Sequence, residues 1–469
     1  MKGGTRMTEK RSKPNRLRFA LMVSGCLAAL LPGNSWGQTL EDALSAAYLN
    51  NPRLLGSRAE LRATNEAVPQ ARSGWRPRVE LNATAGVNRH STDMDLGLGW
   101  ETEYRRPTQV ELGVSQPIYR GGRTQAGVER AENQVLGQRA ILIDTEQNVL
   151  LDAVTAYMNV WRDEAEVRLN INSEEVIRRH LTAARDRFEV GETTRTDVAQ
   201  AESRLARATA QRVASEAQLR TSRAIFREVT GLPAGELSAV EPWAELPESE
   251  QRAADLAQRF NPRVVSSSFF ERASERAVRE RYGELLPEVG VRAAVNEGRD
   301  NQGRGTKDRS AGIFAELSVP IYQQGLVSSQ VREARQVNSQ RRLEMEQARR
   351  AAEQEAISSW ETLQSARAQI VSLNAEIRAA EVALEGVRDE VSVGSRTVLD
   401  LLDQEQELLD AQVNRVRAQR DEVVASYRLL AAVGRLTAAE LGLDVPVYDP
   451  EWDYEAVEDA WYGLSLPNE

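Results

Sequence analysis

The feature that most constrains the fold of this chain is an internal repeat that keeps the same order over most of the sequence. Short motifs of the first half recur in the second half at an offset that changes only once, by seven residues. The matched motifs are Asn51-Pro52-Arg53 with Asn261-Pro262-Arg263, Pro77 with Pro287, Pro117-Ile118-Tyr119 with Pro320-Ile321-Tyr322, and Val190-Gly191 with Val393-Gly394. Because repeats of this kind indicate duplicated structural units, we expect two halves with one common architecture.

Each half is predicted to run helix, strand, strand, helix, helix, so we expect a mixed α and β fold. The first unit then covers residues 38–242 and the second covers residues 243–443. Residues 444–469 form an acidic C-terminal tail with eight acidic and no basic residues. The sequence indicates no mechanism for this tail.

Two stretches of alternating apolar and polar residues in each half predict β-strands. In the first half they cover 79–87 and 110–114, separated by a polar loop over about 89–107, and in the second half they cover 289–295 and 313–319. Stretches of about 9–11 residues with this period are typical of strands in outer-membrane barrels. A soluble hairpin with one wet face has the same pattern, so the strands alone leave both interpretations open.

The rest of each half is predicted to be helical. Residues 40–73 form one helical stretch, and residues 122–190 contain no proline, which predicts a helix on the order of 100 Å long. A shorter helix follows Gly191 and returns to Thr230. In the second half, apolar residues alternate in steps of three and four, as in a coiled-coil seam. These residues are Ile370, Leu373, Ile377, Ala380, Leu384, Val387 and Val391. We therefore expect two short helices, stacked end to end, beside each long one.

The first 37 residues have the layout of a secretory signal peptide. Seven basic residues precede an apolar run from Phe19 to Leu31, which is shorter than the roughly 20 residues of a membrane-spanning helix. The small residues Ser35 and Gly37 favour cleavage between Gly37 and Gln38. The length of the run disfavours a membrane anchor, whereas the lipobox-like stretch that ends at Cys26 leaves lipidation open.

The composition excludes several classes of function. A single cysteine excludes disulfides and cysteine-ligated zinc, and two distant histidines argue against a histidine metal site. No nucleophile–base pair or phosphate-binding glycine loop stands out, so we expect neither an enzyme nor a cofactor. Residues 1–37 hold seven basic and one acidic residue, so their removal would change the net charge from −10 to −16. A net charge of this sign disfavours nucleic-acid binding.

Four strands cannot close a membrane barrel, because the smallest natural barrels have eight. Open strand edges in lipid leave backbone groups unpaired at a cost of several kcal/mol each. If the strands lie in a membrane, two, three or four copies must therefore associate around a rotation axis. The product is a barrel that continues into a cylinder of helices. The alternative is an exported coiled-coil scaffold or interaction protein without a pore.

From about residue 39 to residue 443 the chain resembles the TolC-like outer membrane efflux proteins, also called outer membrane factors. The resemblance rests on the duplicated Asn-Pro, on Pro-Ile-Tyr-x-x-Gly at 117–122 and 320–325, and on Val-Gly followed by Thr-x-x-Asp in each half. It implies a homotrimer in the cell outer membrane, with a twelve-stranded barrel and a long helical barrel in the periplasm.

The same resemblance implies partners and a function. The trimer would be a passive exit duct of an efflux or type I secretion system. It would receive substrates from an inner-membrane pump, of the RND or ABC type, through a periplasmic adaptor (membrane fusion) protein. Apart from the resemblance, we expect the acidic tail to pack outside the barrel near its middle. The sequence does not identify the cargo, the pump or the adaptor.

Two turns at the far end of the long helices can be predicted from the residues alone. Gly191 and Gly394 suit the left-handed backbone that ends a helix. Thr194 and Thr397 each precede an aspartate by three residues, which is the spacing of an N-terminal cap. Read this way, the residues describe two helical hairpins and need no further role.

The resemblance adds functional roles at these turns. It implies that the tips, formed by Val190, Gly191, Val393 and Gly394, meet the adaptor. It places a constriction of the periplasmic entrance at Asp400 and Asp403, where threefold symmetry would form rings of carboxylates that favour cations. It places gate links between Arg396 and the pair Thr196 and Asp197. The tyrosine that joins these links in the family falls on Val391 here, so whether the closed-state network is intact stays open.

Overall fold

The structure of the chain is a computed structural model that describes residues 37–93 and 100–464. The predicted signal peptide and Cys26 lie outside these residues, apart from Gly37. Among the residues that the structure describes, no helix combines the length and apolar character needed to cross a membrane.

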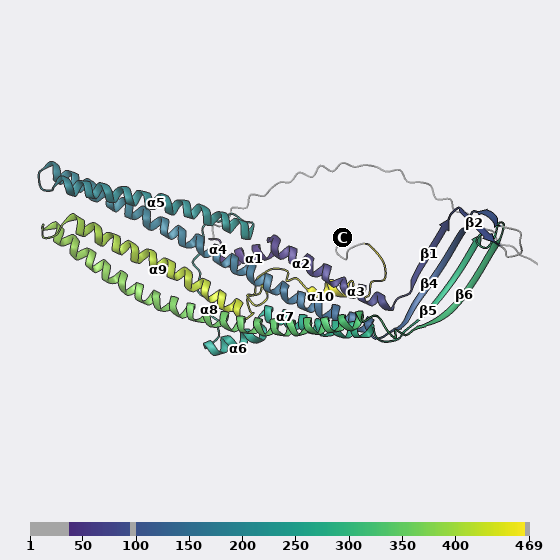
Figure 1. Ribbon diagram of the computed structural model, residues 1–469. Coiled ribbons are helices and arrows are strands. Elements are labelled where there is room, and N and C mark those ends of the chain that lie inside the picture. The colour runs from purple at the N-terminus through teal and green to yellow at the C-terminus, as the bar shows by residue number, and fades with distance from the viewer. Residues whose placement is uncertain (1–36, 94–99, 465–469) are drawn as a thin grey trace, which may run out of the picture. The chain divides into compact units, whose positions relative to one another are not determined.

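The first half begins with short helices, continues with strands and ends with two long helices (Figure 1). Its elements are α1 (Leu40–Asn50), α2 (Pro52–Asn65), α3 (Ala67–Arg72), the 3-10 turn η1 (Ser73–Trp75), β1 (Arg78–Ala85), β2 (Asn88–Asp93), β3 (Trp100–Arg105), β4 (Thr108–Arg120), α4 (Arg123–Glu189) and α5 (Arg195–Thr230).

The second half has the same succession without the extra hairpin. Its elements are α6 (Glu250–Phe260), α7 (Pro262–Gly283), β5 (Glu288–Arg299), β6 (Lys307–Ser318), α8 (Leu326–Ser392) and α9 (Val398–Ala432), and α10 (Pro450–Glu455) follows in the tail. The long helices α4 and α8 each have 67 residues. The predicted long helices and the returning helix that ends at Thr230 are therefore confirmed.

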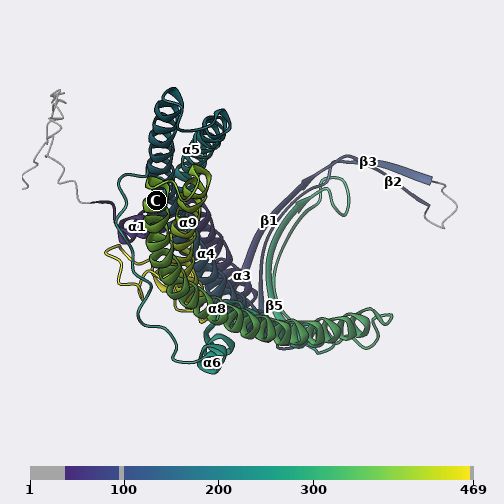
Figure 2. The same cartoon turned by 90° about the vertical axis from the view of Figure 1, so that its left-hand side faces the viewer.

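The four principal strands form one antiparallel sheet in the order β1-β4-β5-β6. Figure 2 shows that this sheet is curved rather than flat. The central pair, β4 and β5, joins the two halves of the chain, with an irregularity in register between Pro117 and Tyr119. Strands β1 and β6 therefore form the two outer edges of the sheet.

The prediction of a polar loop over about 89–107 was wrong in part, because the paired strands β2 and β3 lie there. The two strands pair from Asn88↔Arg105 to Asp93↔Trp100, and the hydroxyls of Ser91 and Thr102 lie 3.0 Å apart across the pair. Hydroxyl and aromatic side chains fit strands as readily as loops. The polarity of these residues could therefore not distinguish a hairpin that is exposed to solvent on both faces from an irregular loop.

The prediction of a single helix over 40–73 was also wrong, because the helix is interrupted at Asn51-Pro52. Proline has no N–H to continue the helix before it but is well suited to the first turn of a new one. The side chain of Asn51 accepts from Arg53 N at 2.9 Å and so caps α2. The same joint in the second half separates α6 from α7, where Asn261 caps α7.

Each of these asparagines also ties its helix to the end of the returning helix. Asn51 Nδ2 donates to Val229 O at 2.9 Å near the end of α5, and Asn261 Nδ2 donates to Ala432 O at 3.0 Å at the end of α9. The asparagine thus satisfies an orphan N–H of one helix and an orphan carbonyl of another. This double role explains how two short helices can be aligned end to end.

We expect Asn261→Ala to destabilise the protein more than Asn51→Ala. Asn261 is buried and Asn51 is half-buried. Without the Asn261 side chain, the N–H of Arg263 and the carbonyl of Ala432 lose their partner at a site that water does not reach. The expected loss is about 2–3 kcal/mol for Asn261→Ala and about 1–2 kcal/mol for Asn51→Ala. Denaturant unfolding of the two purified variants measures both values. Equal losses would contradict a buried joint in the second half.

The main hydrophobic core lies where the short helices, the middle of α4, the end of α9 and the tail meet. Its largest fully buried side chains include Tyr48, Leu54, Leu150 and Tyr157. A second cluster packs α6 and α7 against α8 and α9 around Leu363 and Leu429. The predicted seam of α8 is confirmed, because Ile377, Leu384 and Val387 are buried in a helix that is otherwise largely exposed.

The tail is held by arginines of the first half. We call residues 444–464 the C-terminal strap. Arg72 pairs with Asp459 at 2.5 Å and with Glu458 at 3.2 Å, and Arg139 pairs with Glu451 at 3.4 Å. Its acidic residues therefore have a structural role as partners of α3 and α4, which the sequence did not reveal.

Candidate pore wall and periplasmic gate

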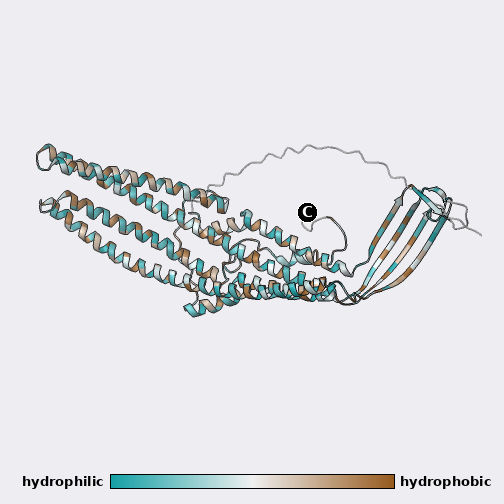
Figure 3. Ribbon diagram, viewed as in Figure 1, coloured by the Kyte–Doolittle hydropathy of each residue, from teal (hydrophilic) through white to brown (hydrophobic). Residues whose placement is uncertain are grey.

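The register of the sheet sorts its side chains into an apolar face and a polar face. Leu81 lies opposite Leu112, which lies opposite Val295, and Val79, Val114, Ala293 and Ile313 form the next row. The rows that alternate with them contain Glu80, Asn82, Glu111 and Arg292. Arg292 Nη2 donates to Glu111 Oε1 at 2.9 Å. Figure 3 shows the resulting bands of hydrophilic and hydrophobic residues along each strand.

The apolar face is exposed in the single chain. Leu81 and Ile313 are 68% and 77% exposed, and Leu112 is about half exposed. Exposed apolar surface that is continuous over four strands marks an interaction with lipid or protein. A soluble hairpin would need another layer to cover this face, and none of the described elements does so. The sheet is therefore a segment of wall with one face for an apolar environment and one for water.

The two helical hairpins end in turns of the same construction, as predicted. Gly191 and Gly394 have φ angles of +84° and +80°. Thr194 and Asp197 form a complete capping box at the start of α5, and Thr397 and Asp400 form another at the start of α9. Hydrogen bonds from the Thr194 side chain and then Thr193 lower the pKa of Asp197, and those from Thr397 lower the pKa of Asp400.

We expect acid to release both caps. Since the pKa of each aspartate is lowered by folding, the cap is fully formed above the unfolded value near 4 and is lost as the pH falls through the folded value. Hydrogen exchange of residues 191–197 and 394–400, corrected for its intrinsic pH dependence, should be constant above about pH 5 and should rise as the pH falls from about 4 to 2. In Asp400→Asn only the first tip should keep this response. Tips whose protection is the same at pH 5 and at pH 2 would contradict the capping account.

The structure places the predicted gate residues at the tips but does not bring all of them together within one chain. Arg396 Nε lies 2.7 Å from Glu390 Oε2, on its own hairpin. Asp197 is engaged by Thr193 and Thr194, so its contact in the chain is the cap. A single chain does not test contacts between subunits, and the links of Arg396 to Thr196 and Asp197 stay a prediction.

The two predicted constriction carboxylates have different contacts. Asp400 is the N3 residue of the capping box of α9, and its carboxylate accepts hydrogen bonds from the N-cap residue Thr397. Asp403, one turn further along, pairs with Arg204 of α5 and so connects the two hairpins. The family resemblance did not indicate this ion pair. The signal for it was the exchange of Gln200 in the first half for Asp403 in the second, opposite a helix rich in arginine.

Further contacts hold the hairpins together behind the tips. Leu402 of α9 is buried against Ile177 and Leu181 of α4. His180 Nε2 lies 3.6 Å from Glu405 Oε1, and Arg388 Nη2 donates to the same oxygen at 3.3 Å. The Arg388 contact lies within the α8–α9 hairpin, whereas the apolar cluster around Leu402 and the polar contacts His180–Glu405 and Arg204–Asp403 join the two hairpins near their tips.

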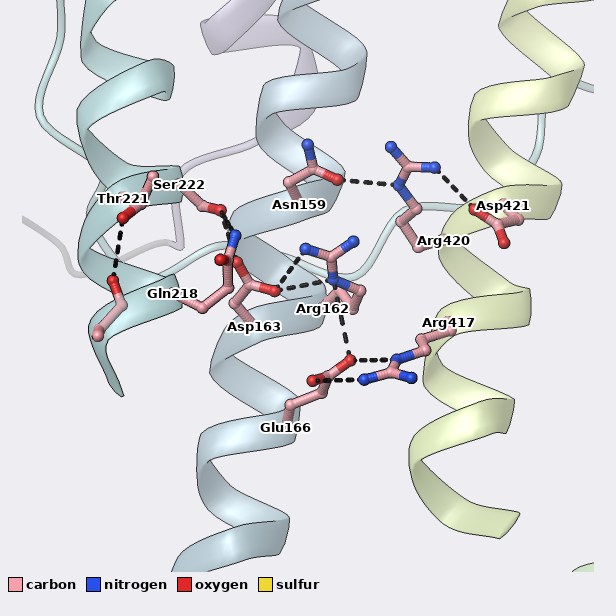
Figure 4. A network of polar contacts seen from close by, with 11 residues as sticks. Asn159, Arg162, Asp163, Glu166, Gln218, Thr221, Ser222, Arg417, Arg420 and Asp421 are labelled. Atoms are coloured by element: carbon pink, nitrogen blue, oxygen red, sulfur yellow. Dashed lines mark hydrogen bonds and ion pairs between the residues drawn. The ribbon is translucent and has the colours of Figure 1, made fainter. Parts of the chain in front are cut away.

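A larger polar network links α5, α4 and α9 further from the tips (Figure 4). Ser222 Oγ donates to the buried Asp163 at 2.5 Å, and Arg162 Nε donates to Asp163 at 2.8 Å. Arg417 of α9 donates to Glu166 of α4 at 2.8 Å. Buried polar groups of this kind are costly unless all are paired, so the network fixes the position of the three helices. Sequence reasoning missed it, because charged residues on a long helix usually face solvent.

Together, a sheet with an exposed apolar face and long hairpins with joined tips define a chain that builds a wall of a membrane channel. A family model described as "Outer membrane efflux protein" matches residues 43–232 and 253–435. The chain belongs to this family. The resemblance to TolC-like proteins is therefore confirmed, and with it the location in the outer membrane, with a helical part in the periplasm.

Individual relatives agree with this assignment. The outer membrane efflux protein BepC of Brucella suis is 35% identical over 96% of both chains. The outer membrane protein TolC of Vibrio cholerae is 24% identical, over 90% of this chain and 96% of its own. The crystal structure of the Campylobacter jejuni CmeC outer membrane channel matches with a TM-score of 0.77 at 13% identity, over 89% of both chains, which shows the shared fold. The family consists of channels rather than enzymes.

Proposed function

We propose that three copies of the chain close a twelve-stranded barrel in the outer membrane and extend it with a helical duct into the periplasm. The observation that carries this proposal is the pair of open edges at β1 and β6, beside an exposed apolar face. Edges of this kind are unfavourable in lipid, and pairing β6 of one copy with β1 of the next removes them. An exported scaffold without a pore would have no need of the apolar face.

The assembled duct would conduct substrates passively from an inner-membrane pump, through a periplasmic adaptor, to the exterior, for efflux or type I secretion. In this account residues 1–37 direct export, 38–242 and 243–443 are the two repeated units of the wall, and 444–469 support it from outside. The relatives named for efflux and the channel fold support this proposal.

The proposed mouth lies at the tips. Asp400 and Asp403 would form the constriction, Arg396 would link to Thr196 and Asp197 of a neighbouring hairpin, and the tips would contact the adaptor. The exposed apolar residues Val190 and Val393, 71% and 78% exposed, support the docking assignment, because exposed valines at a turn are otherwise unexplained. The tips lie at the ends of the two longest helical hairpins, which is where an adaptor could reach them.

Arg396→Ser tests the gate. We expect a several-fold rise in single-channel conductance in planar bilayers, because loss of the guanidinium removes a cross-hairpin link at the narrowest ring. Arg195→Ser is the matched control, since Arg195 is an exposed arginine at the other tip and is not among the proposed links. Equal conductance of wild type and Arg396→Ser would reject the assignment of Arg396.

A further inference from the structure

The last described part of the C-terminal strap is fastened to the base of the sheet by one arginine. Arg76 follows η1 and lies two residues before β1. Its guanidinium donates to the backbone oxygens of Asp459 and Ala460, and it lies over the Trp461 ring, 4.8 Å from the ring centroid. The strap therefore ends beside the point where the short helices pass into the membrane-facing sheet.

The residues beyond this point are apolar or aromatic and turned to solvent. Trp461 is 66% exposed, and Tyr462 and Leu464 are almost fully exposed. Trp75, just before Arg76, is about half exposed. None of these side chains is part of the hydrophobic clusters of the described residues. Trp75, Trp461, Tyr462 and Leu464 therefore expose large apolar or aromatic side chains within a few residues of Arg76 or of its contacts.

The charge of Arg76 is also left without a carboxylate partner. In the described part of the chain no carboxylate lies within ion-pair distance of Arg76, whereas the neighbouring Arg72 pairs with Glu132, Glu458 and Asp459. Arg76 is held by neutral carbonyls that orient it without neutralising it. An oriented, unneutralised guanidinium is suited to bind a phosphate.

We propose that Arg76 and residues 461–464 form an anchor for the inner-leaflet surface of the outer membrane, with lipid headgroups and upper acyl chains as the ligand. The anchor rests on the sheet being the membrane-embedded part of the chain. Val79 and Leu81, on the apolar face of β1, lie three and five residues after Arg76, so the anchor lies next to an apolar surface. Tryptophan and tyrosine prefer the membrane interface, where arginine can pair with lipid phosphates.

Lipid explains these observations better than a second copy of the chain. The nearby carboxylates of Glu458 and Asp459 pair with Arg72 and leave the Arg76 guanidinium available for an external anion. A lipid surface supplies both the phosphate for Arg76 and an apolar layer for Tyr462 and Leu464. The function of the anchor is to fix the depth of the sheet at its periplasmic edge while the strap holds the helices.

Tryptophan quenching by lipid tests the anchor in the full-length assembled protein. The protein is reconstituted in phosphatidylethanolamine–phosphatidylglycerol vesicles with and without bromine near the headgroup end of the acyl chains, and the quenched fraction of the fluorescence is measured. We expect Trp461→Phe to lower this fraction, because it removes a quenched residue. Arg76→Gln should lower it in the same direction, since Trp461 is then no longer held at the surface.

Trp452→Phe is the matched control. Trp452 is a similarly exposed tryptophan of the same strap, in α10, whose neighbour Asp453 lies 3.9 Å from Arg62. The helices α2, α3 and η1 connect Arg62 to Arg76 over a length of about 20 Å at 1.5 Å per residue. Trp452 therefore lies away from the membrane. Its removal should raise the quenched fraction. An unchanged or raised fraction in Trp461→Phe overturns the anchor, and this includes the case in which a neighbouring subunit covers Trp461. If that variant still forms conducting trimers, the proposed channel stands and only the anchor is rejected.

Discussion

Leu112→Arg will prevent assembly of the barrel while leaving the helical part folded. Leu112 lies in the middle of β4, in the apolar row between Leu81 and Val295. A charged residue on the lipid face near the middle of a membrane costs about 2–4 kcal/mol per chain, and each closed barrel would carry this cost in every subunit. We expect folded, heat-resistant oligomers to disappear from outer-membrane extracts, as judged by unheated gel electrophoresis.

Asn82→Arg is the control for this prediction. Asn82 lies one residue from Leu81 on the same sheet, but in the polar row opposite Glu111. The same charge there faces water and should leave the oligomer intact. Equal amounts of oligomer in the two variants would show that the two faces of the sheet are not a lipid face and a water face.

Gly121→Ala is the second change with a large expected effect. Gly121 has a φ of +62°, and a Cβ atom there would lie 2.3 Å from the carbonyl oxygen of Gly283. The clash is between two backbones at the point where the strands meet the helices, so no side-chain rotation relieves it. Strain of the left-handed backbone and displacement of the second chain segment together should cost about 3–5 kcal/mol.

Gly122→Ala separates these two causes. Gly122 has a φ of +76° but nothing within 4 Å of the position of a Cβ atom. The free energy of unfolding of this variant should fall only by the cost of the left-handed backbone for alanine, about 1–2 kcal/mol. Thermal unfolding of both variants measures the difference. Similar midpoints would mean that the close approach of Gly121 and Gly283 does not limit the fold.

The parts of the fold that were predictable have short-range signals. The absence of proline between residues 122 and 190 was enough to predict α4, and the seam around Ile377 predicted which side of α8 is buried. Thr194 and Thr397 predicted their capping boxes because the cap is formed within four residues. These features depend on local geometry, so one stretch of sequence contains the information.

The parts that were not predictable depend on partners far apart in the chain. The polar residues of β2 and β3 have no buried face, and only their pairing distinguishes them from a loop. The role of the tail depends on the pairing of Asp459 with Arg72, and that of Asp403 depends on its pairing with Arg204. Ion pairs between residues far apart in the sequence follow no spacing rule, because any arginine on the facing side of a neighbouring helix can be the partner.

The candidate gate shows the same division. The Thr-x-x-Asp spacing from Thr397 to Asp400 was enough to predict the cap. No sequence pattern predicted the contact of Arg396 with Glu390 on its own hairpin. A link to Thr196 and Asp197 would require a second chain. The sequence therefore predicts which residues lie at the tip, and the assembled symmetry decides which of them meet.

The number of chains in the conducting particle tests the central claim most directly. Native mass spectrometry of detergent-purified protein, with the same sample applied to planar bilayers, measures stoichiometry and conductance together. We predict a mass of three chains, which supply twelve strands from β1, β4, β5 and β6, and discrete single-channel currents. Monomers that leave the bilayer electrically silent would contradict the account.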